Sequence, residues 1–468
     1  MDGSGSGKSA SYSIPNAFQC LGSYVFTDPK GELYDKTAGY LKSQGYDIKV
    51  LNLVNPSNSD GYNPLMHISS EIDVDVVANT IVKGQKSESG SSDPYWDDMA
   101  EMLLKALIYY LMAMRPEEEQ NLASCSELVR AANTNGGSNL LTELMNQLPY
   151  DHPARMNYKS IEIAPEKTYG SILSSLQSKL GKFDSKEIAE VTSTDTINFD
   201  DIGSKKTAVY VISSDTHKAY DFLLTIFFSQ MIQQLYNFAD ENGGRLKVPT
   251  YFILDEFANI GQIPDFDKKI STSRSRGISF SVILQNLDQL EAVYEKSYET
   301  IMGNCDTHVF LGSNSYKTVE YFSKALGEKT IERDSISVSK DKQYHRTGQS
   351  YSDQVMARAL MTPDELRRLD NDLCIIFEKG IKPVKANKFY YFKHKTMASA
   401  LKRNEISHND IGELDRGVWR KFNPYNPWTE DKSEKEAENL KVESLDDLFD
   451  DEPKQEGNKK EPIKVGGP

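Results

Sequence analysis

Two acidic residues follow a strongly apolar run in the middle of the chain. The run extends from Tyr251 to Leu254, and Asp255 and Glu256 come directly after it. Strands of a parallel sheet are buried on both faces and therefore read as continuous apolar runs. In phosphoryl-transfer sites one such acid holds the water shell of Mg²⁺, and the next polarises the attacking water. A strand that runs into an acidic helix cap would give the same pattern.

A second group of residues, at the start of the chain, has phosphate-binding chemistry. Residues 3–9 read Gly-Ser-Gly-Ser-Gly-Lys-Ser and match the end of the P-loop pattern G-x-x-x-x-G-K-[ST], although Asp2 replaces its first glycine. Glycines let backbone N–H groups converge on phosphate oxygens, Lys8 would reach the β- and γ-phosphates, and Ser9 would ligate Mg²⁺. A Gly/Ser linker or tag remnant is the alternative. The candidate cofactor-binding residues are Gly5, Ser6, Gly7, Lys8 and Ser9.

A P-loop normally follows a strand of the sheet, but only Met1 and Asp2 precede the glycines of this one. We therefore expect that the chain is N-terminally truncated and that the first strand of its sheet is missing. An open reading frame upstream of Met1 that encodes a strand and two apolar spans would establish this truncation.

Composition limits the class of protein. The chain has 468 residues, enough for about two or three domains, and an apolar fraction of 38% that suits a globular protein with a disordered segment. Its four cysteines lie far apart and its seven histidines are scattered, which argues against a disulfide framework or a metal cluster. The net charge of −15 does not favour general affinity for duplex DNA, so a nucleic-acid contact must be local. No apolar run reaches the roughly 20 residues of a membrane span, so the chain as written is expected to be soluble and cytoplasmic.

Apolar runs and turn residues predict an α/β fold interrupted by helices. Strands are expected over 23–28, 47–53, 207–213, 249–256, 279–285, 307–311, 374–378 and 388–392. Helices are expected from about 32 to 43 and over 219–240, 265–276, 287–296 and 319–326. The polar, Ser-rich stretch 85–92 is expected to be a linker, and a helix is expected to start at 93–95, with Pro94 at an early helical position. The periodicity of residues 96–190 is helical throughout, and the polar stretch 330–354 is predicted to be a mobile loop.

These patterns divide the chain into four predicted parts. They are a first part of a nucleotide-binding domain (1–90), an all-α domain (91–195), a second nucleotide-binding part with a C-terminal extension (196–428), and a disordered acidic tail (429–468). The tail alternates acidic and apolar residues, so it either folds onto a partner or serves only to keep the chain soluble.

Several short blocks, taken together, resemble the coupling ATPases of conjugation and type IV secretion. The similarity extends from Gly3 to about Trp428, and the order and spacing of the blocks are more specific than any single one. The blocks are GSGKS (5–9) with IPN (14–16), TDPKGEL (27–33), NPL (63–65), DPYW (93–96), LDEFANIG (254–261), SRSRG (273–277) and LQN (284–286).

The resemblance implies a RecA-like P-loop NTPase sheet with an inserted all-α domain, ATP and Mg²⁺ as cofactors, and a homo-hexameric ring. Family members recruit relaxase-bound single-stranded DNA or protein substrates and drive them into a type IV secretion channel. The implied partners are relaxase and relaxosome proteins and the ATPases of the channel. The implied location is the cytoplasmic face of the bacterial plasma membrane, reached through an N-terminal anchor that this sequence lacks.

The resemblance also implies roles for individual residues. Lys8 corresponds to the phosphate lysine and Ser9 to the Mg²⁺ ligand. Asp255 corresponds to the acid of the metal shell and Glu256 to the base that activates water. Gln285 corresponds to the amide that senses the γ-phosphate.

In a ring, an arginine from a neighbouring subunit stabilises charge in the transition state. Arg274 is the candidate rather than Arg276, because its spacing to Gly277 fits the family better. A solvated helix end is the alternative for both arginines.

Another polar group, Asp28, Lys30 and Glu32, lies at the carboxyl end of a predicted strand, where α/β sheets bind ligands. A local salt-bridge cluster is the alternative for these three residues.

Two other functions stay open at this point. An FtsK-like cytosolic DNA translocase would share the RecA-like core, but the helical insertion and the block at 93–96 favour the coupling family. A non-hydrolysing, truncated remnant could instead act as an adaptor that binds relaxosome proteins. A nucleotide-binding titration separates that adaptor from a motor.

Overall fold

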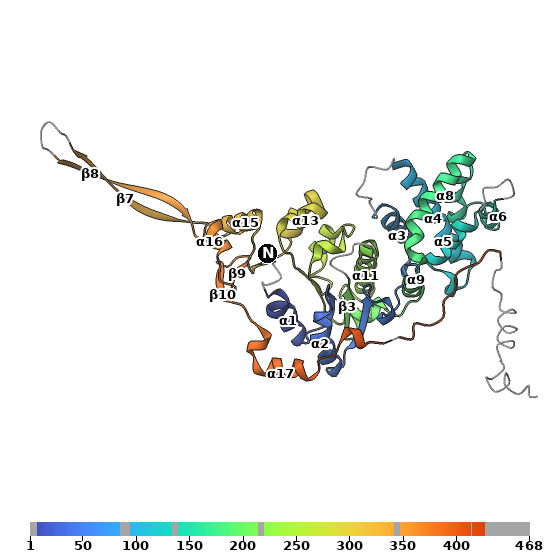
Figure 1. Cartoon of the computed structure of the whole chain (residues 1–468), viewed down its shortest axis with the longest axis horizontal. Helices are drawn as coiled ribbons and strands as arrows, with labels where there is room; N and C mark the ends of the chain where they lie inside the picture. Colours follow the sequence, from blue (N-terminus) through green and yellow to red (C-terminus); the bar gives the residue numbers. More distant parts are fainter. Residues whose placement is uncertain are drawn as a thin grey trace, which may run out of the picture. The chain divides into compact units, whose positions relative to one another are not determined.

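The structure is a computed structural model that describes residues 7–84, 94–132, 139–213, 220–340, 347–412 and 414–425. The chain up to Lys421 forms one compact unit. This unit contains a five-stranded sheet, a three-stranded sheet, a two-stranded antiparallel pair and many helices (Figure 1). The linker predicted over 85–92 and the tail predicted over 429–468 lie outside the described residues.

The central sheet has the order β2-β3-β1-β4-β5, and every pair in it is parallel. Its strands are β1 (Ser23–Thr27), β2 (Asp47–Asn52), β3 (Thr207–Ile212), β4 (Thr250–Leu254) and β5 (Ile278–Val282). In the register of the sheet, Thr27 lies between Val211 and Leu254, the last residue of β4. Because the strands all run the same way, the residues that follow them meet at one edge of the sheet.

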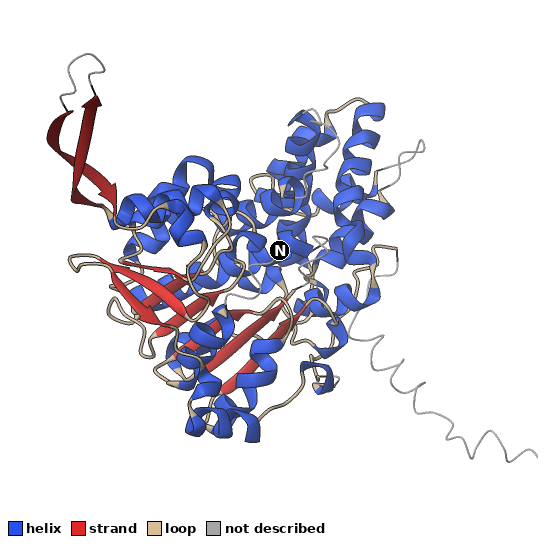
Figure 2. Ribbon diagram, turned by 60° about the vertical axis from the view of Figure 1, so that its left-hand side comes forward, coloured by secondary structure: helices blue, strands red, loops and turns tan. Residues whose placement is uncertain are grey.

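Helices cover both faces of this sheet, which explains why its strands are almost continuously apolar (Figure 2). On one face, Tyr24 and Phe26 of β1 form a core with α1 (Ile14–Phe18) and α2 (Glu32–Ser43). Val25 lies on the opposite face, because side chains alternate along a strand. On that face α10 (Phe199–Ser204) contacts β1 and β3, and Phe266 contacts Phe280 of β5. The predicted α/β sheet is therefore confirmed.

Between β2 and β3 the structure describes helices and connecting loops, and no strand among the described residues. The elements are α3 (Glu71–Lys83), α4 (Pro94–Met114), α5 (Leu122–Ala131), α6 (Leu140–Met145), α7 (Pro153–Glu162), α8 (Glu166–Leu180), α9 (Lys186–Ser193) and α10. The long helix α4 begins at Pro94, as the sequence predicts, and packs against α3, α7 and α8. The proposed boundaries of this helical domain stay a prediction.

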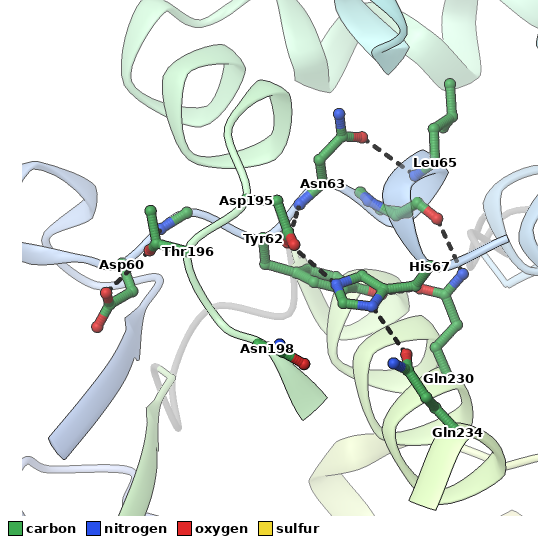
Figure 3. A network of polar contacts seen from close by, with 12 residues as sticks. Asp60, Tyr62, Asn63, Leu65, His67, Asp195, Thr196, Asn198, Gln230 and Gln234 are labelled. Atoms are coloured by element: carbon green, nitrogen blue, oxygen red, sulfur yellow. Dashed lines mark hydrogen bonds and ion pairs between the residues drawn. The ribbon is translucent and has the colours of Figure 1, made fainter. Parts of the chain in front are cut away.

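A polar network joins the outgoing segment, which follows β2 and contains His67, to the returning segment, which precedes β3 and contains Asp195 (Figure 3). Nε2 of His67 lies 3.0 Å from Oδ1 of Asp195, and its Nδ1 lies 3.0 Å from Oε1 of Gln234 in α11 (Asp221–Glu241). The hydroxyl of Tyr62 donates to Oε1 of Gln230, in the same helix. The outgoing and returning segments are thus fastened to each other and to α11.

The elements after β5 include a second sheet that is antiparallel. In it β9 (Leu373–Glu378) pairs with β6 (Thr307–Phe310) on one side and with β10 (Val384–Asn387) on the other. The strand predicted over 388–392 is wrong, because β10 ends at Asn387 and residues 388–392 are not in a strand. The remaining helices are α12 (Phe266–Thr272), α13 (Leu287–Tyr294), α14 (Tyr298–Gly303), α15 (Tyr316–Leu326), α16 (Pro363–Arg367) and α17 (Lys395–Arg403).

The mobile loop predicted over 330–354 is also wrong for the residues that the structure describes. Two long strands, β7 (Glu328–Lys340) and β8 (Thr347–Ala359), pair along their whole length (Figure 1). Their sequences are rich in Ser, Thr and charged residues, and the apolar alternation by which a half-buried strand is recognised is confined to short stretches such as 335–339.

In the part of the chain that the structure describes, every helix is too short or too polar to span a lipid bilayer.

We expect Tyr62→Phe to lower the free energy of unfolding by about 1–3 kcal/mol, because Oε1 of Gln230 would stay buried without its donor. Tyr316→Phe is the matched control, since Tyr316 is 67% exposed and its hydroxyl should matter little. Urea unfolding curves measure both changes. Equal stability of the two variants would contradict a structural role for the network.

Candidate functional site

The glycine-rich segment leads directly into a helix. Gly7 has a φ of +69°, which only glycine adopts readily, and Lys8 precedes a π-helical turn over Ser9–Ser13 that continues as α1. The N–H of Ser11 donates to the carbonyl of Gly7 at 2.8 Å, whereas the first N–H groups of a helix have no partner within the helix. Such donors bind phosphate well. Gly5 and Ser6 lie outside the described residues.

The two acids after β4 are held in fixed positions by their backbone. Glu256 adopts left-handed dihedral angles, φ +50° and ψ +45°, which are rare for a residue other than glycine and recur at functional sites. Its N–H donates to Oδ1 of Asp255 at 3.0 Å, and the hydroxyl of Thr27 donates to the carbonyl of Asp255 at 2.7 Å. The strained turn therefore directs two adjacent carboxyl groups toward the same edge of the sheet.

The structure brings the amino-terminal residues and the acid pair together. Oγ of Ser9 donates to Oδ2 of Asp255 at 3.4 Å, although the two residues are 246 positions apart in the chain. Nζ of Lys8 lies 3.8 Å from Oε1 of Glu256. Nε2 of Gln285 donates to the same oxygen at 2.9 Å. Five of the residues predicted from the sequence thus share one site.

The electrostatics of this site favour a bound cation. Burial raises the pKa of Asp255, the charge of Glu256 raises it further, and the ammonium of Lys8 opposes both effects. Among the described residues, no group of three or more His, Cys, Asp and Glu side chains is arranged to hold a metal ion by itself. Asp255 and Ser9 fit Mg²⁺, which commonly binds one or two protein oxygens and takes its other ligands from phosphates and water.

The two candidate arginines have different environments. Nε and Nη2 of Arg276 each donate to Asp240 at 2.9 Å, and its guanidinium lies 4.7 Å from the ring centre of Tyr236. The side chain of Arg274 is 93% exposed, and its Nη1 lies 4.0 Å from Asp306. Arg276 therefore fastens the turn after α12 to α11, whereas Arg274 extends into solvent.

The predicted polar group at the end of β1 is not a cluster. Asp28 is only 2% exposed, and its Oδ2 accepts the N–H of Tyr34 at 2.8 Å, near the start of α2. Lys30 and Glu32 are exposed to solvent. Burial raises the pKa of Asp28 to about 6, which the hydrogen bonds from the backbone of α2 only partly offset. Asp28 thus anchors a helix beside the candidate site.

Sequence reasoning missed one residue of the site, Tyr390. Its ring covers Gly7 so closely that a Cβ added to this glycine would lie 2.8 Å from Cε1 of the tyrosine. The hydroxyl of Tyr390 donates to the carbonyl of Asn371 at 3.1 Å, which holds the ring in place. No motif or spacing connects Tyr390 with Gly7 in the sequence, because only the packing of the segment after β10 brings them together.

We expect Asp28→Asn to remove a dependence of stability on pH. The folded state holds the Asp28 proton more tightly than the unfolded chain, so wild-type stability falls as pH rises from 3.8 to about 6. A shift of this size corresponds to at most roughly 3 kcal/mol. The variant should therefore match the wild type at pH 3.5 and exceed it in stability at pH 7.5.

Urea unfolding across this pH range measures the difference, with Asp306→Asn as control because Asp306 is largely exposed. An Asp28→Asn variant that is less stable than the wild type at pH 7.5 would contradict the assignment.

The chain is similar to curated conjugation proteins. It is 26% identical over 389 residues to "Conjugal transfer protein TraG" of Escherichia coli, covering 78% of this chain and 60% of that protein. It is 24% identical over 410 residues to "Protein VirD4" of Rhizobium rhizogenes, covering 84% of this chain and 58% of that protein. The chain thus spans about 60% of the length of the curated relatives that it matches.

Solved structures share the fold. The bacterial conjugative coupling protein TrwBdeltaN70, in its unbound monoclinic form, superposes with a TM-score of 0.57 at 18% identity, covering 82% of each chain. The plasmid coupling protein TrwB in complex with the ATP analogue ADPNP gives a TM-score of 0.57 at 16% identity, covering 82% of this chain and 83% of that one. This likeness confirms the predicted RecA-like fold.

The family described as "Type IV secretory system Conjugative DNA transfer" has a sequence model that matches residues 1–413. That match covers most of the chain, which therefore belongs to the type IV secretory family of conjugative DNA transfer proteins.

Proposed function

We propose that this chain is the ATPase part of a coupling protein that drives relaxase-bound DNA, or a protein substrate, into a type IV secretion channel. Membership of the conjugative DNA transfer family supports the transport role. The observation that carries the ATPase assignment is the approach of Lys8 and Ser9 to Glu256 and Asp255 across one sheet edge. The family match also favours this function over an FtsK-like translocase.

Each residue of the site has a role in this proposal. Lys8 and the N–H groups of the first helical turn bind the β- and γ-phosphates of ATP. Ser9 and Asp255 would hold Mg²⁺, which would supply positive charge to the phosphate oxygens. Glu256 accepts a proton from the attacking water, and Gln285 positions Glu256 and detects the γ-phosphate.

Two observations support ATP and Mg²⁺ as the cofactors. The strained residue Glu256 and the buried Asp255 place two carboxyl groups beside the ammonium group of Lys8. A Mg²⁺ ion would offset the negative charge that Lys8 leaves uncompensated. TrwB, which shares the fold, has been solved in complex with ADPNP and in complex with ADP and Mg²⁺.

The proposal includes assembly and location. A homo-hexameric ring would place the exposed Arg274 of one subunit against the nucleotide of the next. The ring would receive DNA from relaxosome proteins, contact the ATPases of the secretion channel, and lie at the cytoplasmic face of the plasma membrane.

We expect Lys8→Ala in the full-length protein to weaken ATP binding and abolish turnover. Glu256→Gln should keep ATP binding and lower turnover by about 10²–10⁴-fold, because the amide cannot accept the proton. Titration with a fluorescent ATP analogue and phosphate release measure the two steps. Lys324→Ala is the control, since this lysine lies on α15 and is 76% exposed. Wild-type turnover in a Lys8→Ala, Glu256→Gln double variant would contradict the ATPase roles proposed for these two residues.

Arg274→Ala should keep ATP affinity and lower turnover by about 10³-fold or more, as the loss of an arginine finger does. Mixed rings test whether the arginine acts on its neighbour: Arg274→Ala and Glu256→Gln subunits, each inactive alone, should regain part of the activity when combined. Arg276→Ala should lose stability instead, because its contacts lie within the chain. Full turnover in Arg274→Ala would exclude the finger role.

A further inference from the structure

Aromatic side chains are exposed to solvent close to the glycine-rich segment. Phe389 and Phe392 follow strand β10 and are 46% and 54% exposed, whereas Tyr390 between them is only 8% exposed. Large apolar side chains that gather at the surface of one segment indicate a binding site. Of the two exposed rings, Phe392 is the one that the packing connects with the candidate ATPase site.

Tyr390 joins Phe392 to the glycine-rich segment. The ring of Tyr390 covers Gly7, and its hydroxyl donates to the carbonyl of Asn371 at 3.1 Å. The ring of Phe392 stacks on that of Tyr390, with the ring centres 5.1 Å apart and an angle of 24° between the planes. The two rings thus form a stack that begins at Gly7 and ends in solvent.

Neighbouring residues hold this stack in place. Nζ of Lys393 lies 4.7 Å from the ring centre of Tyr390 and 3.3 Å from Oδ2 of Asp372. The ring of Tyr391 meets that of Phe392 edge-on, with the ring centres 5.5 Å apart, and packs against the core that α1 and α2 form with β1. A ring that is already held in position loses little conformational freedom when a ligand binds to it. The exposed ring of Phe392 is therefore preorganised.

A flat aromatic heterocycle is the ligand that suits such a ring. Offset stacking between π systems is favourable, and a nucleobase stacks on an aromatic side chain whichever base it is, because every base has a π face. In ATP the ribose joins the base to the phosphates, so the base must lie within one nucleotide's length of the phosphate site. The stack of Tyr390 and Phe392 starts at Gly7 and meets this requirement.

The two ends of a bound nucleotide would have separate partners in this arrangement. The acid pair after β4 approaches Lys8 and Ser9, at the site proposed for the terminal phosphates and Mg²⁺. The aromatic stack approaches Gly7 instead, the residue that precedes Lys8. A base on the stack would therefore leave the terminal phosphates at the acid pair.

We propose that the exposed face of Phe392 stacks on the base of the nucleotide, and that Tyr390 positions Phe392 for this contact. This role of Phe392 rests on the proposed function, which supplies ATP as the ligand. It adds a residue that recognises the base to a site whose other residues recognise the phosphates and the metal ion.

The test compares ADPNP, a non-hydrolysable ATP analogue, with inorganic tripolyphosphate, which has three linked phosphates but no base. Calorimetric titration of the 468-residue chain with each ligand, in the presence of Mg²⁺, measures the two affinities without turnover. Phe392→Ala should lower the affinity for ADPNP by about 5–150-fold, the range expected when a stacking ring is removed, and leave that for tripolyphosphate unchanged. Phe392→Leu, which keeps apolar bulk without a π system, replaces this variant if it does not fold.

Two further variants separate stacking from a general effect on this segment. Phe389→Ala is the matched control and should leave both affinities unchanged, because Phe389 is also exposed but its ring stacks on His394, with the ring centres 3.9 Å apart. Phe392→Trp should keep the affinity for ADPNP. Because a stacked base quenches an indole ring, the added tryptophan fluorescence should fall with ADPNP and not with tripolyphosphate.

Three results would contradict the role of Phe392. The first is an unchanged affinity of Phe392→Ala for ADPNP. The second is an equal loss of affinity for both ligands, which would show that the ring only supports the glycine-rich segment. The third is a loss that accompanies a change in the sedimentation of the chain, which would assign the exposed rings to contact with another chain.

Failure of this role and failure of the proposed function are distinguishable in the same titrations. A wild-type chain that binds ADPNP no more tightly than tripolyphosphate would contradict the role of Phe392 and leave the ATPase proposal intact. A wild-type chain that binds neither ligand would contradict both.

Discussion

The approach of the amino-terminal helix to the end of β4 is the interaction on which the candidate site depends. It exists because β1 and β4 are parallel neighbours, and the hydroxyl of Thr27 at the end of β1 holds the carbonyl of Asp255 at the end of β4. The parallel direction of all five strands gathers the residues after each of them at one edge. Lys8 and Ser9 are held at that edge in part because the hydroxyl of Tyr12, one turn further along, is hydrogen-bonded to Ser281 of β5.

The electrostatics of this edge fit a site that binds a cation. An isolated buried carboxylate is unfavourable unless it is paired or coordinates a cation. Here Asp255 and Glu256 are adjacent, and the ammonium group of Lys8 lies beside them. The backbone at Glu256 is also strained, and a strained residue persists only where the surrounding structure holds it. These features are costly for folding alone and are consistent with binding a polyphosphate and its metal ion.

Much of this arrangement follows from sequence patterns that depend on local physics. Buried parallel strands are continuously apolar, so β1, β3 and β4 were predictable to within about two residues. The helix start at Pro94 was predictable because proline is favoured at that position. The strands β7 and β8 were harder to predict, because most of their residues are polar and alternation with apolar residues is confined to short stretches such as 335–339.

Other features of the site depend on tertiary packing, which local patterns do not encode. Arg274 and Arg276 belong to one motif, and only the position of Asp240 on α11 shows that Arg276 is engaged within the chain. Asp28 follows a strand at the edge where α/β sheets bind ligands, but its carboxyl group accepts a hydrogen bond from the backbone at the start of α2. The contact of Tyr390 with Gly7 likewise arises from segments far apart in the sequence.

A crystal structure of the full-length protein with Mg²⁺ and a non-hydrolysable ATP analogue tests the central claim most directly. The account predicts that Nζ of Lys8 contacts the γ-phosphate, that the metal ion lies between Ser9 and Asp255, and that Glu256 faces the phosphorus atom. An analogue bound elsewhere, with Lys8 still on Glu256, would contradict it.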